Sequence, residues 1–207
     1  MIGVLMESCQ AAGERFFRLY HGHCVEPDKD TLFNLLNSIH SLNDRLRKAT
    51  GEHFFSCNEF VALKALRNLF HHEAELINEV RIIPVKKLPS VSTDLLFLCL
   101  VPSRLVLLSF EQLDRKRRTH EEAIVRTTLK WYGNVVNINP CVFNFAVHAF
   151  EKLSELGIHI GGDKYVGFQA SYESEEEAGH SHFITGDIIC HAGSVEEVLA
   201  VTFANIV

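Results

Sequence analysis

The sequence predicts a mainly α-helical protein, in which an antiparallel helical bundle over residues 1–157 is followed by a mixed α/β extension over residues 158–207. Apolar residues recur with helical spacing in most of the first part, whereas glycine-rich and alternating stretches follow Gly157. The 207 residues are 47% apolar and 22% charged, which is typical of globular proteins rather than disordered or fibrous ones. The extension is either part of the same domain or a small unit of its own.

The clearest predicted helix covers residues 28–49. Pro27 and Asp28 suit its start, and Thr50-Gly51 suits its end because glycine readily adopts the left-handed conformation that closes a helix. One apolar stripe with i, i+3, i+4, i+7 spacing runs along it, formed by Leu32, Leu35, Leu36, Ile39, Leu42 and Leu46.

A second helix is predicted from Ser56 to about Val80. Ser56 and Glu59 have the spacing of a capping box, in which each side chain bonds a free backbone N–H of the other residue. Pro84 limits how far the helix extends. The short connection predicts that the first two helices are antiparallel neighbours.

Two further segments precede residue 132. Residues 95–110 are too short to cross a membrane and are interrupted at Pro102, so we expect two buried elements bent at the proline. A helix is predicted over residues 119–131, where Thr119 and Glu122 have the spacing of another capping box.

The C-terminal third is predicted to contain both helices and short strands. A helix over residues 139–157 is predicted from Asn139-Pro140 at its start and Gly157 at its end. Short strands and loops are then predicted for residues 165–173, the acidic run 173–177 and residues 182–193. A last helix is predicted from Ser194.

Net charge restricts the class of function. The chain has 20 basic and 26 acidic residues, a formal charge of −6, which argues against a protein that coats nucleic acid non-specifically. Residues 151–207 hold two basic and ten acidic residues, whereas the first 150 hold 18 basic and 16 acidic ones. The first part is therefore where a local phosphate-binding site is compatible with the charge.

Cysteine usage and the N-terminal residues indicate the compartment. The N-terminus lacks a basic leader followed by an apolar core, so no secretory signal is expected. We expect a cytoplasmic protein with no membrane segment. Six cysteines without a C-x-x-C pair are predicted to be reduced and structural, namely Cys9, Cys24, Cys57, Cys99, Cys141 and Cys190.

One motif, Arg67-Asn68-x-x-x-His72, lies within the second predicted helix. It resembles the R-N-x-x-x-H signature of the HEPN superfamily, α-helical domains many of which are metal-independent ribonucleases in toxin–antitoxin or anti-phage systems. The resemblance covers about residues 28–83. It implies a HEPN-like bundle, an RNA substrate, a homodimer whose motif helices form the interface, and an antitoxin or regulatory protein as a further partner.

The residue types of the motif fit this chemistry. RNA carries its own nucleophile, the 2′-OH, so cleavage without a metal needs a proton carrier and a cation that stabilises charge on the phosphate. His72 suits the first role, and the planar donors of Arg67 suit the second. Asn68 lies on nearly the same face as His72, where it can orient the imidazole.

The geometry of a single helix limits this site. Arg67 and His72 lie about 140° apart around the helix axis, so one copy does not point both at the same atom. The resemblance implies that two copies complete the site across a twofold axis. His71 shares the face of Arg67 and is either an auxiliary proton carrier or phosphate ligand, or a surface histidine beside Glu75.

Two further sequence features, a basic run and two groups of histidines and cysteines, are weaker indications of function. A basic run is either an RNA-backbone contact or a solvated loop before a helix; it comprises Arg115, Lys116, Arg117 and Arg118. His21-x-His23-Cys24 and His180-x-His182 with Cys190 and His191 lack the spacing of a metal site, so no metal or cofactor is expected. Walker, dinucleotide-binding and G-x-S-x-G motifs are absent from the sequence.

The sequence therefore predicts a metal-independent endoribonuclease that cleaves RNA through its 2′-OH. One alternative is a non-catalytic HEPN-like dimer that binds RNA, a nucleotide or a protein partner, and the negative net charge favours this alternative. The other is an unrelated fold, in which the motif is a coincidence and the C-terminal region holds the function.

Overall fold

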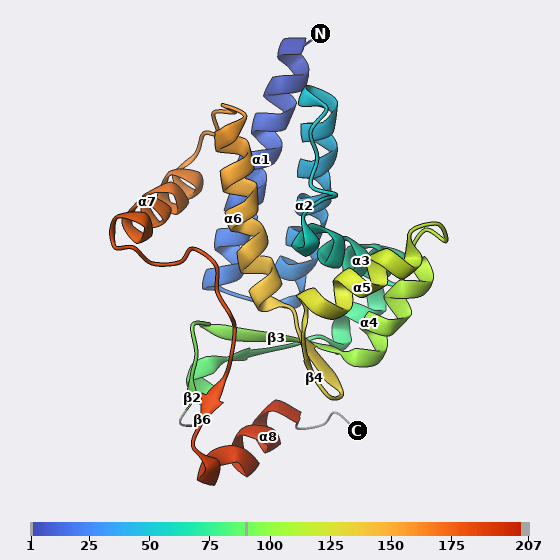
Figure 1. Cartoon of the computed structure of the whole chain (residues 1–207), viewed down its shortest axis with the longest axis vertical. Coiled ribbons are helices and arrows are strands. Elements are labelled where there is room, and N and C mark those ends of the chain that lie inside the picture. The colour runs from blue at the N-terminus through green and yellow to red at the C-terminus, as the bar shows by residue number, and fades with distance from the viewer. Residues whose placement is uncertain (1, 90, 204–207) are drawn as a thin grey trace.

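A hairpin of two long helices begins the chain in the computed structural model, which describes residues 2–89 and 91–203. Helix α1 spans Ile2–Val25, helix α2 spans Lys29–Thr50, and they lie side by side (Figure 1). Asp28 caps α2 by accepting a hydrogen bond from the Thr31 backbone N–H at 2.6 Å, and Gly51 ends it with a φ of 84°. The helix predicted over residues 28–49 is confirmed, whereas α1 was not predicted.

Helix α3 spans Asn58–His72 and is shorter than predicted. The chain leaves the helix at Glu73 and continues as a 3-10 helix, Ala74–Glu79, and strand β1, Arg81–Pro84. The prediction of one helix to Val80 was wrong because Glu73, with a φ of −133°, leaves the helical conformation, and residues 74–79 turn the chain toward strand β1, whose pairing with β3 is a non-local interaction.

The predicted start of α3 is also corrected. Cys57 occupies the N-cap position without a side-chain capping bond, so the Ser56 capping box does not form. The carboxylate of Glu59 interacts with His148 instead. Helices α2 and α3 are neighbours, as predicted, but α3 crosses α2 rather than running back along it (Figure 1).

A four-stranded antiparallel sheet lies next to the helices, with strand order β1-β3-β5-β4. The prediction of a mainly helical chain is confirmed. The sheet, however, falls inside the segment predicted to be a helical bundle, so the bundle is interrupted between residues 81 and 137. Cys99 of β3 pairs with Ile82, and Val136 of β5 pairs with both Val101 and Trp131. Its remaining strands are β3 at Phe97–Pro102, β4 at Lys130–Tyr132 and β5 at Val135–Asn137.

Pro102 joins strand β3 directly to helix α4, Ser103–Ser109. This confirms the prediction of two buried elements bent at the proline. Helix α5 spans Arg118–Thr128 and ends before the predicted residue 131, because Lys130 begins strand β4. Arg117 occupies the N-cap position of α5, so the capping box predicted at Thr119 does not form.

Helix α6 spans Asn139–Glu155, with Pro140 in its first turn, and confirms the predicted helix. Gly157 follows it with a φ of 63°. Asn139 is not a cap: its buried amide donates a hydrogen bond to the backbone oxygen of Phe97 at 2.7 Å. This bond ties the start of α6 to the sheet.

Helix α7 spans Asp163–Glu177, where short strands and an acidic loop were predicted. The prediction was wrong because the aromatic residues of this segment suggested a strand, whereas they lie on one helical face against the core. Tyr165 and Phe168 contact the ring of Phe17, and Tyr172 contacts the ring of Phe150 at 4.7 Å. The burial of these rings stabilises a helix of otherwise polar sequence.

The end of the described chain contributes to a second, two-stranded sheet. Strand β6, Ile189–Cys190, pairs with β2, Val91–Ser92. The predicted last helix is confirmed as α8, Val195–Phe203, which lies at the opposite end of the molecule from the free end of the α1–α2 hairpin (Figure 1). A small apolar cluster under this region includes Leu98 and Leu100 of β3.

The main core lies among the long helices and the sheet. The ring of Phe145 on α6 contacts Phe16 of α1 at 5.5 Å and Phe54 of the α2–α3 loop at 5.3 Å, both edge to face. These contacts hold the α2–α3 pair in place against α1 and α6. The six cysteines are free thiols. No helix within residues 2–89 and 91–203 is both long and apolar enough to span a bilayer.

Candidate functional site

The guanidinium of Arg67 is held by two amide side chains. Its Nε donates to Oδ1 of Asn37 on α2 at 3.1 Å, and its Nη1 donates to Oδ1 of the adjacent Asn68 at 3.3 Å. Arg67 is half-buried, and both acceptors are neutral. Within the described ranges no carboxylate forms an ion pair with it, so the fixed guanidinium keeps its positive charge available for an anion.

Asn68 has a different partner from the one expected. Its Oδ1 accepts the hydrogen bond from Arg67, whereas the sequence predicted that its amide would orient His72. Arg67 and Asn68 are adjacent in the chain, and the long side chain of Arg67 folds back onto the amide of Asn68. This hydrogen bond takes the place of the one expected between Asn68 and the imidazole of His72. Asn68 therefore positions the guanidinium in this structure.

His71 and His72 lie at the exposed end of α3. Their ring centroids are 5.6 Å apart, with the planes inclined at 71°. His71 is close enough to the α2 side of the site to influence the ionisation of His40, whereas His72 faces a different side of the helix. One copy of the chain thus leaves Arg67 and His72 pointing in different directions.

Arg67 lines a shallow groove between α2 and α3 of about 240 Å³, which we call the α2–α3 groove. Arg45 and Lys48 add two further positive charges on α2, against the single carboxylate of Asp44. The groove is thus locally basic within a chain of net negative charge. It is lined by Asn37, His40, Ser41, Asp44, Arg45, Lys48 and Arg67.

His40 is a candidate functional residue that the sequence analysis missed. Its Nδ1 lies 3.5 Å from Oδ2 of Asp44, one helical turn further on. Burial lowers the pKa of His40, and the positive charges of Arg67 and Lys64 lower it further, against the opposing effect of Asp44. The imidazole is therefore mainly neutral at pH 7 and able to accept a proton. The only sequence signal for this pair is the i, i+4 spacing of a histidine and an aspartate.

The basic run covers the end of the loop before α5 and the first residue of that helix, Arg118, at the edge of the molecule (Figure 1). Arg115, Lys116 and Arg117 are exposed, whereas Arg118 donates to the backbone oxygen of Glu111 at 3.0 Å. In residues 2–89 and 91–203, no hydrogen bond or ion pair joins the run to Arg67. The run is thus available to a ligand but is not part of the α2–α3 groove.

The histidines considered for metal binding take separate roles. His23 is buried and bonds Thr31 at 2.9 Å, whereas His182 stacks on Tyr172 and bonds Glu175. His21 and Cys24 line the same cleft as His182, but they do not form a three-ligand cluster there. Among the described residues, the only such cluster consists of Cys57, Glu59 and His148.

Comparison with known proteins leaves the family open. No protein-family model matches the chain, and no curated protein or solved structure matches it. The HEPN resemblance therefore rests on Arg67, Asn68 and His72 and on their place in α3.

Proposed function

We propose that the protein is a metal-independent endoribonuclease of the HEPN type, with its phosphate-binding site in the α2–α3 groove. The observation that carries this proposal is the guanidinium of Arg67, held by Asn37 and Asn68 and free of any described carboxylate partner. A fixed, uncompensated cation suits the stabilisation of a phosphate that gains charge in the transition state.

The reaction needs two proton transfers. The ribose 2′-OH loses its proton and attacks the phosphorus, the bond to the 5′-oxygen breaks, and that oxygen takes up a proton. The products are a 2′,3′-cyclic phosphate and a free 5′-OH. In this proposal His72 is the proton carrier, Arg67 stabilises the phosphate, and Asn37 and Asn68 position Arg67. His71, on the groove side of α3, is an auxiliary proton carrier or phosphate ligand.

The divergence of Arg67 and His72 on one helix supports a homodimeric site. Two copies whose α3 helices face each other across a twofold axis would bring the Arg67 of one chain to the His72 of the other. The exposed residues Arg115, Lys116 and Arg117 would then contact the RNA backbone beyond the site. A role in toxin–antitoxin or anti-phage defence, in the cytoplasm and with a regulatory protein as partner, follows from the resemblance.

The alternative is a HEPN-like dimer that binds RNA, a nucleotide or a protein without cleaving. The hydrogen bond between Asn68 and Arg67 favours this alternative, since it takes the amide oxygen away from the imidazole of His72. The formal charge of −6 favours it as well, because a tight RNA binder is usually more basic.

Cleavage of RNA in EDTA tests the proposal. Wild-type protein is expected to leave 2′,3′-cyclic phosphate ends, and His72→Ala and Arg67→Ala are expected to abolish cleavage. His120→Ala and Arg15→Ala are matched controls, because they remove an exposed histidine and an exposed arginine elsewhere. RNA bound but left uncut by the wild type would support the binding alternative. Cleavage unchanged in both site variants would refute the assignment of the site.

A further inference from the structure

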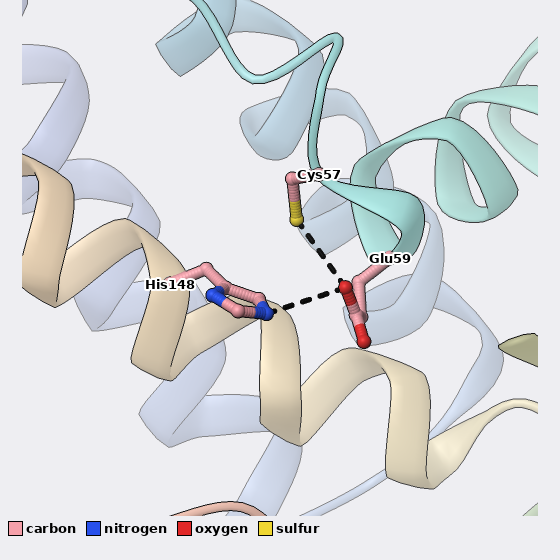
Figure 2. Close-up of side chains that lie close together, drawn as sticks. All are labelled: Cys57, Glu59 and His148. Atoms are coloured by element: carbon pink, nitrogen blue, oxygen red, sulfur yellow. Dashed lines mark hydrogen bonds and ion pairs between the residues drawn. The ribbon is translucent and has the colours of Figure 1, made fainter.

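Three ligand-type side chains converge where α3 begins and α6 passes it. Cys57 is the N-cap residue of α3, Glu59 lies in its first turn, and His148 lies on α6. The Cys57 thiol donates to Oε2 of Glu59 at 3.4 Å, and Nε2 of His148 lies 3.3 Å from the same oxygen. Figure 2 shows the sulfur and the imidazole nitrogen both pointing at this carboxylate.

The separations of these atoms suit a tetrahedral ion. One ligand atom from each of the three residues lies within 4.8 Å of the other two. Zinc bonds of about 2.0–2.3 Å place neighbouring ligands of a tetrahedron roughly 3.3–3.6 Å apart. The pairs of Glu59 with Cys57 and with His148 already have this spacing, and the Cys57 and His148 ligand atoms lie within 4.8 Å of each other, so side-chain rotations that bring these two closer would complete the site.

The surroundings add two features of a metal site. Nδ1 of His148 lies 3.8 Å from Oε2 of Glu151, and the other oxygen of Glu151 accepts a hydrogen bond from the Tyr172 hydroxyl at 3.1 Å. At this distance the carboxylate interacts with the imidazole electrostatically; a closer approach would give the hydrogen bond that fixes the ring of a ligating histidine and raises its basicity. A groove of about 230 Å³ opens beside Cys57 and His148, and leaves room for water as a fourth ligand.

We propose that Cys57, Glu59 and His148 bind one divalent transition-metal ion, with zinc as the preferred ion and water in the fourth position. A thiolate, an imidazole and a carboxylate are ligands that zinc accepts together, whereas magnesium and calcium select oxygen ligands. Binding replaces the S–H bond of Cys57 by a metal–sulfur bond and releases the proton to solvent. The ion would bridge the loop before α3 to α6.

Cobalt(II) is the probe, because a cobalt–thiolate bond gives a near-ultraviolet charge-transfer absorption and a tetrahedral site gives visible bands. The reduced full chain is titrated with CoCl₂, and zinc is then added to displace the cobalt. We expect one ion per chain with both signatures, and their loss in Cys57→Ser and in His148→Gln. Glu151→Gln is expected to weaken binding about 10- to 100-fold.

Matched controls separate this site from adventitious binding. Cys190→Ser removes a half-buried thiol of another element, and Glu155→Gln removes a carboxylate of the same groove that lies outside the ligand set. Both should bind cobalt as the wild type does. His148→Gln serves as the decisive variant if circular dichroism shows that Cys57→Ser is unfolded. Absence of thiolate absorption in the wild type, or equal affinity in His148→Gln, would overturn the proposal. It does not rest on the ribonuclease proposal, since that reaction is assayed in EDTA.

Discussion

His23 offers a pH-dependent prediction that follows from its burial. The ring lies at the end of α1, fully buried, with Nδ1 at 2.9 Å from the Thr31 hydroxyl and the ring of Phe97 at 5.3 Å. Its Nε2 is buried and has no partner within the described part of the chain. Loss of solvation lowers the pKa of His23 from 6.5 to about 4, against the opposing effect of Asp28.

The sign and size of the effect follow from proton linkage. Above pH 6.5 the imidazole is neutral in both the folded and the unfolded chain, so its contribution does not change with pH. Between pH 6.5 and 4 the unfolded chain binds a proton that the folded chain excludes, so the free energy of unfolding falls as the pH falls. The gap between the two pKa values corresponds to about 3 kcal/mol.

Urea unfolding at pH 7.5 and at pH 4.5 measures this contribution. His23→Gln removes the titrating group, and His120→Gln removes an exposed histidine as the matched control. Between the two pH values, the wild type and the control should lose about 2–3 kcal/mol more than His23→Gln. An equal loss in all three proteins would refute the argument that burial excludes the proton from His23.

Three further outcomes are expected. An equimolar mixture of the inactive Arg67→Ala and His72→Ala variants should recover about a quarter of wild-type cleavage. Half of the dimers in the mixture contain one chain of each variant, and each such mixed dimer has one of its two composite sites intact. No recovery after subunit exchange would contradict a shared site. Asn37→Ala should lower the cleavage rate at saturating RNA about tenfold, because Arg67 loses one of its two fixing hydrogen bonds; an effect on RNA affinity alone would contradict this positioning role. Gly51→Ala should lower the free energy of unfolding by about 1 kcal/mol, because the φ of 84° suits glycine. Gly22→Ala is the control, since Gly22 lies inside α1 with open space around it and its replacement should not destabilise the protein. Thermal unfolding of both variants measures the difference.

Local patterns predicted the elements whose interactions are local. Helix α2 has a continuous apolar stripe and a glycine at its end, and α6 has a proline in its first turn, so both were predicted nearly at their observed bounds. Helix α7 was missed because its rings are buried against α1 and α6, which are far away in sequence. The sheet was missed because its strands are short and gain stability only from pairing, such as that of Leu100 with Asn137.

The candidate site also has a part that the sequence predicts and a part that only the tertiary structure shows. The residues Arg67, Asn68 and His72 and their place on a helix follow from the sequence alone, because a motif and a helical period are local properties. The partner of Arg67 was decided by tertiary structure, since Asn37 lies thirty residues earlier and meets it only when α3 packs against α2. The same holds for His148, which meets Cys57 and Glu59 only when α6 packs across the start of α3. Side chains this distant in sequence come together because the helices that carry them bury their apolar faces against one another. A local sequence pattern does not predict which helices pack together.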